Sequence, residues 1–105
     1  MTPEGRLLKR FLEWLDERAI PYIRLALRPG VKTGWPDVEI ILKGGRPLFV
    51  EFKRPGLRKA RLTQDERHAE LRARGYDVCL TDSFDEAVAA VAQAVDARKL
   101  SARRS

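Results

Sequence analysis

Residues that can support phosphodiester hydrolysis lie close together near the middle of the chain. Asp37 follows Gly34-Trp35-Pro36, and Glu51 and Lys53 alternate within the segment Phe49-Val50-Glu51-Phe52-Lys53. Hard cations such as Mg²⁺ take oxygen ligands and keep several waters, so two carboxylates and a backbone carbonyl suffice to hold one. An ammonium group beside them can hold the attacking water or the phosphate. The pattern therefore predicts a magnesium-dependent phosphodiesterase site.

We predict Asp37 and Glu51 as metal ligands, with the backbone carbonyl of Phe52 as a third ligand. Purely structural roles would also suit Asp37 and Lys53. Asp37 is a reasonable turn residue after a proline, and Lys53 is a reasonable solvated lysine at a strand end. Glu51 is harder to assign to a structural role. A carboxylate flanked by Val50 and Phe52 in a central strand is costly to bury unless it is paired or metal-bound.

A β-hairpin is needed to bring these side chains together. Apolar residues alternate along 38–43 and 47–53, on either side of Gly44-Gly45-Arg46. Alternation of period two, interrupted by a glycine pair, predicts two antiparallel strands joined by a tight loop.

The hairpin register decides which residues meet. A three-residue loop places both apolar sets on one face and pairs Glu39 with Glu51 and Asp37 with Lys53. A strict two-residue turn would place Asp37 and Glu51 on opposite faces. The metal hypothesis therefore requires the longer loop or a bulge.

The remaining elements are predicted from apolar periodicity and capping residues. They are a helix from Pro3 that ends before Pro21, a weak strand over 22–27, a loop over 28–36, a helix from Thr63 to about Arg74, a strand over 76–81 and a last helix after Ser83. The order α-β-β-β-α-β-α predicts an α/β fold in which helices pack against a sheet.

Composition indicates a single globular domain. The chain has 105 residues, of which 44% are hydrophobic, which is enough for one core. No apolar stretch approaches the roughly 20 residues of a membrane span, and the N-terminus does not resemble a signal peptide. Cys79 is the one cysteine, so a disulfide within the chain is excluded, which fits a reducing compartment. We expect a cytoplasmic protein with no membrane partner.

The net charge of +6 is unevenly distributed. The last eight residues contain four cations and no acid, and without them the balance is only +2. Residues 53–61 contain five cations and no acid. A basic segment that begins at Lys53 suggests a polyanion delivered to the site, although a solvated loop could have the same composition. The predicted DNA-binding residues are Arg54, Arg58, Lys59 and Arg61.

At these positions the chain resembles the PD-(D/E)XK nuclease superfamily, and within it the small stand-alone VRR-NUC domains of phages and bacteria. The matching positions are Glu4, the run 34–37, the run 49–56, Gln64 and the run 75–78. The resemblance covers residues 4 to about 92. One mild departure is Leu62-Thr63, where a serine-containing turn often precedes the glutamine.

The resemblance implies a restriction-endonuclease-like core, a mixed sheet flanked by helices. It also implies a homodimeric endonuclease that requires Mg²⁺ or Mn²⁺ and cuts branched DNA, such as four-way (Holliday) junctions or flaps, in DNA repair or recombination in a bacterial cell or phage-infected host. By the same resemblance Lys53 is the catalytic lysine, Glu4 and Gln64 are auxiliary site residues, and Glu4 is a possible metal ligand. A helicase or repair protein is a possible partner.

The domain boundaries and the single histidine give two further expectations. Residues 1–98 are expected to form the VRR-NUC-like nuclease domain, and residues 99–105 a basic, disordered tail. His68, the only histidine, is expected at the surface. The alternative function is a non-catalytic nucleic-acid-binding module that retains the nuclease fold.

Overall fold

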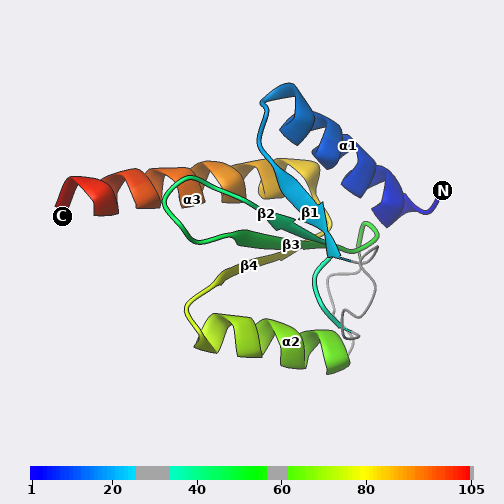
Figure 1. Cartoon of the computed structure of the whole chain (residues 1–105). Helices are drawn as coiled ribbons and strands as arrows, with labels where there is room; N and C mark the ends of the chain where they lie inside the picture. The colour runs from blue at the N-terminus through cyan, green and yellow to red at the C-terminus, as the bar shows by residue number, and fades with distance from the viewer. Residues whose placement is uncertain (26–33, 57–61, 105) are drawn as a thin grey trace.

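A computed structural model describes residues 1–25, 34–56 and 62–104, with side chains described as far as 97. Its elements are α1 (Pro3–Glu17), β1 (Tyr22–Arg24), β2 (Val38–Ile40), β3 (Leu48–Phe52), α2 (Leu62–Ala73), β4 (Asp77–Thr81) and α3 (Phe84–Arg104). The predicted order α-β-β-β-α-β-α is confirmed (Figure 1). Among the described residues, no helix is long and apolar enough to cross a membrane.

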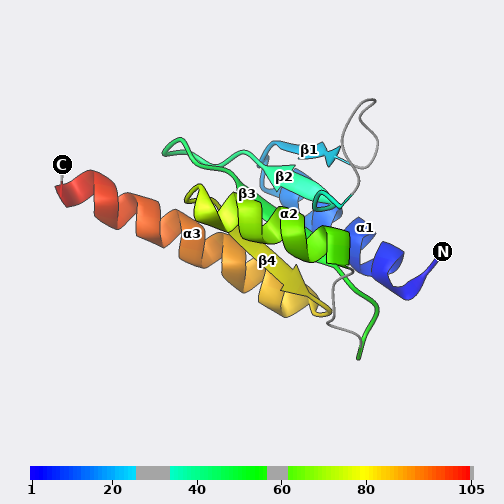
Figure 2. The ribbon, with the colours of Figure 1, turned by 90° about the horizontal axis from the view of Figure 1, so that it is seen from below.

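The four strands form one mixed sheet in the order β1-β2-β3-β4. The pairs β1–β2 and β2–β3 are antiparallel, whereas β3 and β4 are parallel. A parallel pair needs a crossover connection, and the segment that contains α2 supplies it. Helices α1 and α3 cover one face of the sheet and α2 covers the other (Figures 1 and 2).

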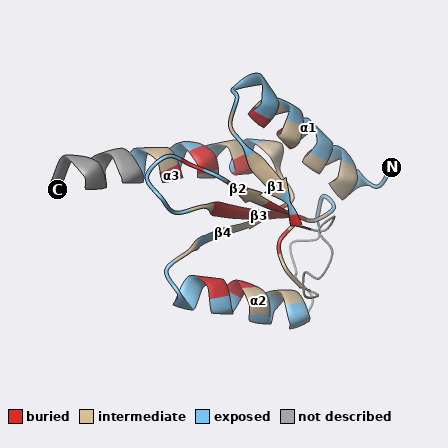
Figure 3. Cartoon of the chain, in the orientation of Figure 1, coloured by how far each residue is buried: buried red, intermediate tan, exposed pale blue. Residues whose placement is uncertain are grey.

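Each face of the sheet has its own apolar core. The core under α1 and α3 includes Phe11, Val50 and Phe52, all at most 2% exposed. The core under α2 is smaller and contains Leu25, Phe49 and Leu71. Because successive side chains of a strand point to opposite faces, the alternation along β3 places Glu51 on the α2 side. All five residues of β3 are buried (Figure 3).

Helix α1 begins as its sequence predicts. The Thr2 side chain accepts a hydrogen bond from the backbone N–H of Gly5 at 3.1 Å, and Pro3 occupies the first helical position, where its missing N–H costs nothing. Helix α3 begins in the same way, because the hydroxyl of Ser83 accepts the backbone N–H of Glu86 at 3.3 Å.

The observed hairpin register differs from the predicted one by two residues. Val38 pairs with Val50 and Ile40 with Leu48, whereas the prediction paired Glu39 with Glu51. The tight three-residue loop is wrong because the strands stop early, at Ile40 and Leu48, and a longer connection joins them. A shift of two residues leaves every side chain on its predicted face.

The segments that flank this core differ in part from the expected ones. The expected loop over 28–36 lies mostly outside the described residues, as does the end of the expected strand over 22–27. Helix α3 continues to Arg104, so helical backbone extends through most of the segment 99–105, where we expected a tail.

Candidate active site

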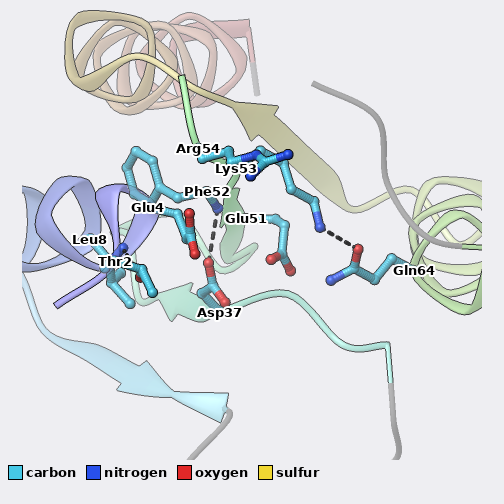
Figure 4. Close-up of a pocket in the computed structure, with 10 residues that line it drawn as sticks. Thr2, Glu4, Leu8, Asp37, Glu51, Phe52, Lys53, Arg54 and Gln64 are labelled. Atoms are coloured by element: carbon cyan, nitrogen blue, oxygen red, sulfur yellow. Dashed lines mark hydrogen bonds between the residues drawn. The ribbon is translucent and has the colours of Figure 1, made fainter. Parts of the chain in front are cut away.

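A cavity of about 500 Å³ opens at the end of the sheet where β3 finishes (Figure 4). Every predicted site residue that the structure describes lines it: Glu4, Asp37, Glu51, Phe52, Lys53, Arg54 and Gln64. These residues come from the N-terminus of α1, the β2–β3 hairpin and the N-terminus of α2. The predicted DNA-binding residues Arg58, Lys59 and Arg61 lie outside the described residues.

Asp37 is fixed at the entry to β2 by two hydrogen bonds. Its carboxylate oxygen Oδ2 accepts the backbone N–H of Phe52 at 2.8 Å, and its carbonyl oxygen accepts the backbone N–H of Leu25 at 3.0 Å. The side chain thus bridges to β3 at the point where the regular ladder ends. This bridge holds the carboxylate beside the last residues of β3.

Asp37 and Glu51 form a close pair of carboxyl groups. Burial raises the pKa of Asp37, and the opposing influences are the hydrogen bond from Phe52, a hydrogen bond with the Glu51 side chain, and the charges of Lys53 and Arg24. Glu51 is only 4% exposed. Two neighbouring carboxyl groups repel when both are ionised, so a cation placed between them would stabilise both charges.

Lys53 connects β3 to α2. Its ammonium nitrogen Nζ donates to the Oε1 atom of Gln64 at 2.6 Å, and its backbone N–H donates to the carbonyl of Thr81 at 2.9 Å. Because both ends of the residue are held, the ammonium group stays at the rim of the cavity beside Glu51 (Figure 4). Gln64 therefore orients the lysine that the sequence identified.

The Glu4 side chain reaches the cavity from the first turn of α1. Figure 4 shows the carboxylates of Glu4, Asp37 and Glu51 turned towards a common space. Within the described residues, however, no group of three or more histidine, cysteine, aspartate or glutamate side chains is close enough to hold a metal ion together. The donor set therefore fits a hard cation that takes the Asp37–Glu51 pair and keeps water molecules for its other positions, as Mg²⁺ does.

Two contributors to the site have no distinctive sequence signal. Arg24, on β1, is close enough to lower the pKa of Asp37, yet a single arginine in a weak strand indicates nothing by itself. Asp82, after β4, accepts the backbone N–H of Gly56 at 2.9 Å through Oδ2. Asp82 thereby holds the start of the basic segment against the β4–α3 connection.

The turn that carries Asp37 packs closely on the first turn of α2. Gly34 has a φ of +91°, and a Cβ added there would lie 2.6 Å from the carbonyl oxygen of Thr63. Trp35 packs on Phe49, with ring centroids 6.4 Å apart. The glycine is therefore required both by its backbone conformation and by the close approach of α2.

The surface position expected for His68 is wrong. His68 is 2% exposed and lies on the buried side of α2. The helix is mostly polar, so its buried face is short and its apolar pattern is weak. The sequence pattern of α2 therefore did not indicate that His68, one turn after Gln64, faces the sheet.

Comparison with known proteins identifies the family. No family model matches the sequence, and no curated protein matches it significantly. A solved structure described as a "VRR_NUC domain" is 30% identical, with a TM-score of 0.69 and an alignment over 82% of this chain and 90% of that one. A second, described as a "VRR_NUC domain protein", is 25% identical, with a TM-score of 0.69 and coverage of 89% and 88%.

These matches define a nuclease-type domain with a mixed sheet flanked by helices. The chain belongs to the VRR-NUC family.

Proposed function

We propose that this protein is a Mg²⁺- or Mn²⁺-dependent endonuclease that cuts branched DNA, such as four-way junctions or flaps. The observation that carries the proposal is the convergence of Asp37, Glu51 and Lys53 on one open cavity, with Gln64 bonded to the lysine. The preference for branched DNA rests on the family resemblance alone.

Each residue has a defined role in the proposed reaction. Asp37 and Glu51 would hold the cation, with the Phe52 carbonyl as a further oxygen ligand and Glu4 as an auxiliary group. The cation would neutralise phosphate charge and lower the pKa of a bound water. Lys53, oriented by Gln64, would donate a hydrogen bond to the attacking water or to a phosphate oxygen.

The surroundings of the cavity favour a polyanionic substrate. Helices α1 and α2 both begin there, and the partial positive charge of a helix N-terminus favours a phosphate. Arg54 is exposed at the rim, and the basic segment that follows it adds Arg58, Lys59 and Arg61. Contacts of this kind position a phosphate backbone without reading its sequence.

A homodimer is part of the proposal. Because the Asp37–Glu51 pair would serve one cleavage site in each chain, symmetric cutting of two strands would require two chains related by a two-fold axis. The proposed setting is DNA repair or recombination in the cytoplasm of a bacterial cell or phage-infected host, where a helicase or repair protein could deliver the substrate.

The decisive experiment is a cleavage assay on labelled four-way junction, flap, duplex and single-stranded DNA. Each substrate is incubated with Mg²⁺, Mn²⁺ or EDTA, and Lys53→Ala is assayed beside the wild-type protein. We expect metal-dependent cutting of branched DNA that Lys53→Ala abolishes while DNA binding, measured by gel shift, is retained.

The alternative function, a non-catalytic nucleic-acid-binding module, gives a different result. Such a module would bind these substrates without cutting any of them, and it would bind no divalent cation through Asp37 and Glu51. Binding without cleavage in all three metal conditions would replace the nuclease proposal with this one.

A further inference from the structure

His68 is a buried polar residue with no role in the proposed reaction. Its side chain is 2% exposed, and its Nε2 atom has no hydrogen-bond partner within the described part of the chain. Buried polar atoms in native proteins are nearly always hydrogen-bonded, so an exception calls for a physical reason. A purely apolar side chain would fill the same position without leaving a polar atom unsatisfied.

The placement of α2 over β3 and β4 indicates what His68 faces. At one end, Gln64 of α2 bonds to Lys53, which directly follows β3. Further along, Leu71 of α2 and Phe49 of β3 belong to one buried cluster. The hydrogen bond and the shared cluster align α2 with β3 at two places, and His68 lies between them on the helix.

The matching position on the strand is Glu51. Four helical residues advance about 6 Å, and two strand residues advance about 6.6 Å, so the steps from Gln64 to His68 and from Lys53 to Glu51 are nearly equal. In the sheet Glu51 pairs with Leu80 of β4, whose side chain is apolar. Of this cross-strand pair, Glu51 is therefore the polar side chain that His68 would face.

We propose that His68 is a positioning residue for Glu51, and that its Nε2–H donates a hydrogen bond to the Glu51 carboxylate when that carboxylate binds a divalent cation. The inference rests on the proposed function, because it assigns Glu51 to the metal. Carboxylates that ligate metals are commonly held by such outer hydrogen bonds, whose loss typically lowers metal affinity about 10- to 100-fold.

The charges around His68 are consistent with a neutral imidazole in this role. Burial is the main influence that lowers the pKa of His68, Arg72 and Lys53 lower it further, and Asp65 opposes them. A neutral imidazole carries one N–H and can donate one hydrogen bond. It would hold the Glu51 carboxylate without competing for it as a second cation.

The first test is a Mn²⁺ titration of wild-type protein, His68→Leu, His68→Gln and Glu51→Gln by isothermal calorimetry. Leucine retains buried volume but has no N–H, whereas glutamine retains a donor. We expect His68→Leu to weaken Mn²⁺ binding about tenfold or more, His68→Gln to recover part of the loss, and Glu51→Gln to weaken it at least as much. Circular dichroism establishes that each variant is folded.

The outcomes separate this inference from the function on which it rests. If wild-type protein binds Mn²⁺ in a manner that depends on Glu51 and His68→Leu binds it equally well, the role of His68 is refuted and the metal site stands. Equal weakening in the leucine and glutamine variants would also refute it, because packing alone would account for the loss. Absence of Mn²⁺ binding by the wild-type protein would overturn both proposals.

A second test observes the imidazole of His68 directly. His68 is the only histidine, so ¹⁵N-histidine labelling gives NMR signals from this imidazole alone. On addition of Mg²⁺ we expect the Nε2–H form to dominate and its signal to shift, with no such shift in Asp37→Asn. Signals that do not respond to Mg²⁺, in a protein that calorimetry shows to bind it, would refute the proposed hydrogen bond.

Discussion

Asp37 and Glu51 lie opposite each other across the β2–β3 hairpin, one residue beyond the pair formed by Val38 and Val50. In the predicted register Asp37 would instead have faced Lys53. The observed pairing brings the two carboxyl groups close enough for Glu51 to lower the pKa of Asp37, and it leaves Lys53 beyond the ladder, where Gln64 holds it. The register thus separates the carboxyl pair from the ammonium group and places both beside one cavity.

Asp37→Asn should stabilise the metal-free protein while removing metal binding. The folded-state pKa of Asp37 is raised, so its favourable contribution to folding is present below the unfolded-state pKa and is lost as pH rises through the folded-state pKa. At neutral pH the ionised carboxylate therefore costs stability, and asparagine still offers an oxygen to the Phe52 N–H. Thermal denaturation in EDTA should show a higher Tm, by about 4–8 °C for each kcal/mol gained.

The same measurement at acidic pH provides the control. As the pH falls through the raised pKa of Asp37, the wild-type carboxyl group becomes protonated, so the difference in Tm between wild type and Asp37→Asn should shrink. A variant that is less stable than wild type at pH 7 would show that Asp37 contributes more through its contacts than it costs through burial.

Gln64→Leu should reduce turnover more than substrate affinity. The 2.6 Å hydrogen bond from Lys53 to Gln64 fixes the ammonium group, and misplacing a catalytic group by about 1 Å can cost about 100-fold in rate. We expect kcat to fall about 10- to 100-fold, with little change in KM. Steady-state kinetics on the best branched substrate would measure both constants, and a rise in KM alone would identify Gln64 as a DNA contact.

Gly34→Ala should destabilise the protein more than Gly45→Ala. Both glycines have positive φ, +91° and +100°, but a Cβ at position 34 would lie 2.6 Å from the Thr63 carbonyl oxygen, whereas at position 45 it would meet nothing within 4 Å. Gly45→Ala therefore measures backbone strain alone, of about 1–2 kcal/mol. Urea denaturation should give a larger loss for Gly34→Ala, and equal losses would show that α2 moves aside without cost.

The sequence predicted the faces of the site strands better than their alignment. Period-two alternation fixes which side chains share a face, and a shift of two residues preserves it, so Asp37 and Glu51 were brought together despite the wrong register. The exact pairing depends on where β2 and β3 end, and a glycine-rich connection does not determine that. Motif residues such as Gln64 were therefore easier to place than the hairpin that carries their partners.

Contacts between distant segments were the part that sequence could not supply. The bond from Gly56 to Asp82 joins two exposed turns, and neither residue type is distinctive there. His68 was misplaced for a related reason: α2 is largely polar, and its burial follows from how the helix packs on the sheet. Such contacts depend on the tertiary arrangement, which leaves no periodic pattern in the chain.

His68 should make the metal-free protein less stable as pH falls. Its folded-state pKa is lowered from 6.5, mainly by burial, so its contribution to stability is present above the unfolded-state pKa and is lost as pH falls below about 6.5 and through the folded-state pKa. Asp37, whose pKa is raised, acts in the opposite direction on the same acid limb. The measurement is the difference in unfolding free energy between wild type and His68→Leu, from urea denaturation in EDTA between pH 7.5 and pH 5. Asp37 is present in both proteins, so its contribution cancels from this difference when the two sites act independently. We expect wild type to lose stability relative to His68→Leu across this range, and a difference that stays constant with pH would show that the imidazole does not titrate differently in the folded and unfolded protein.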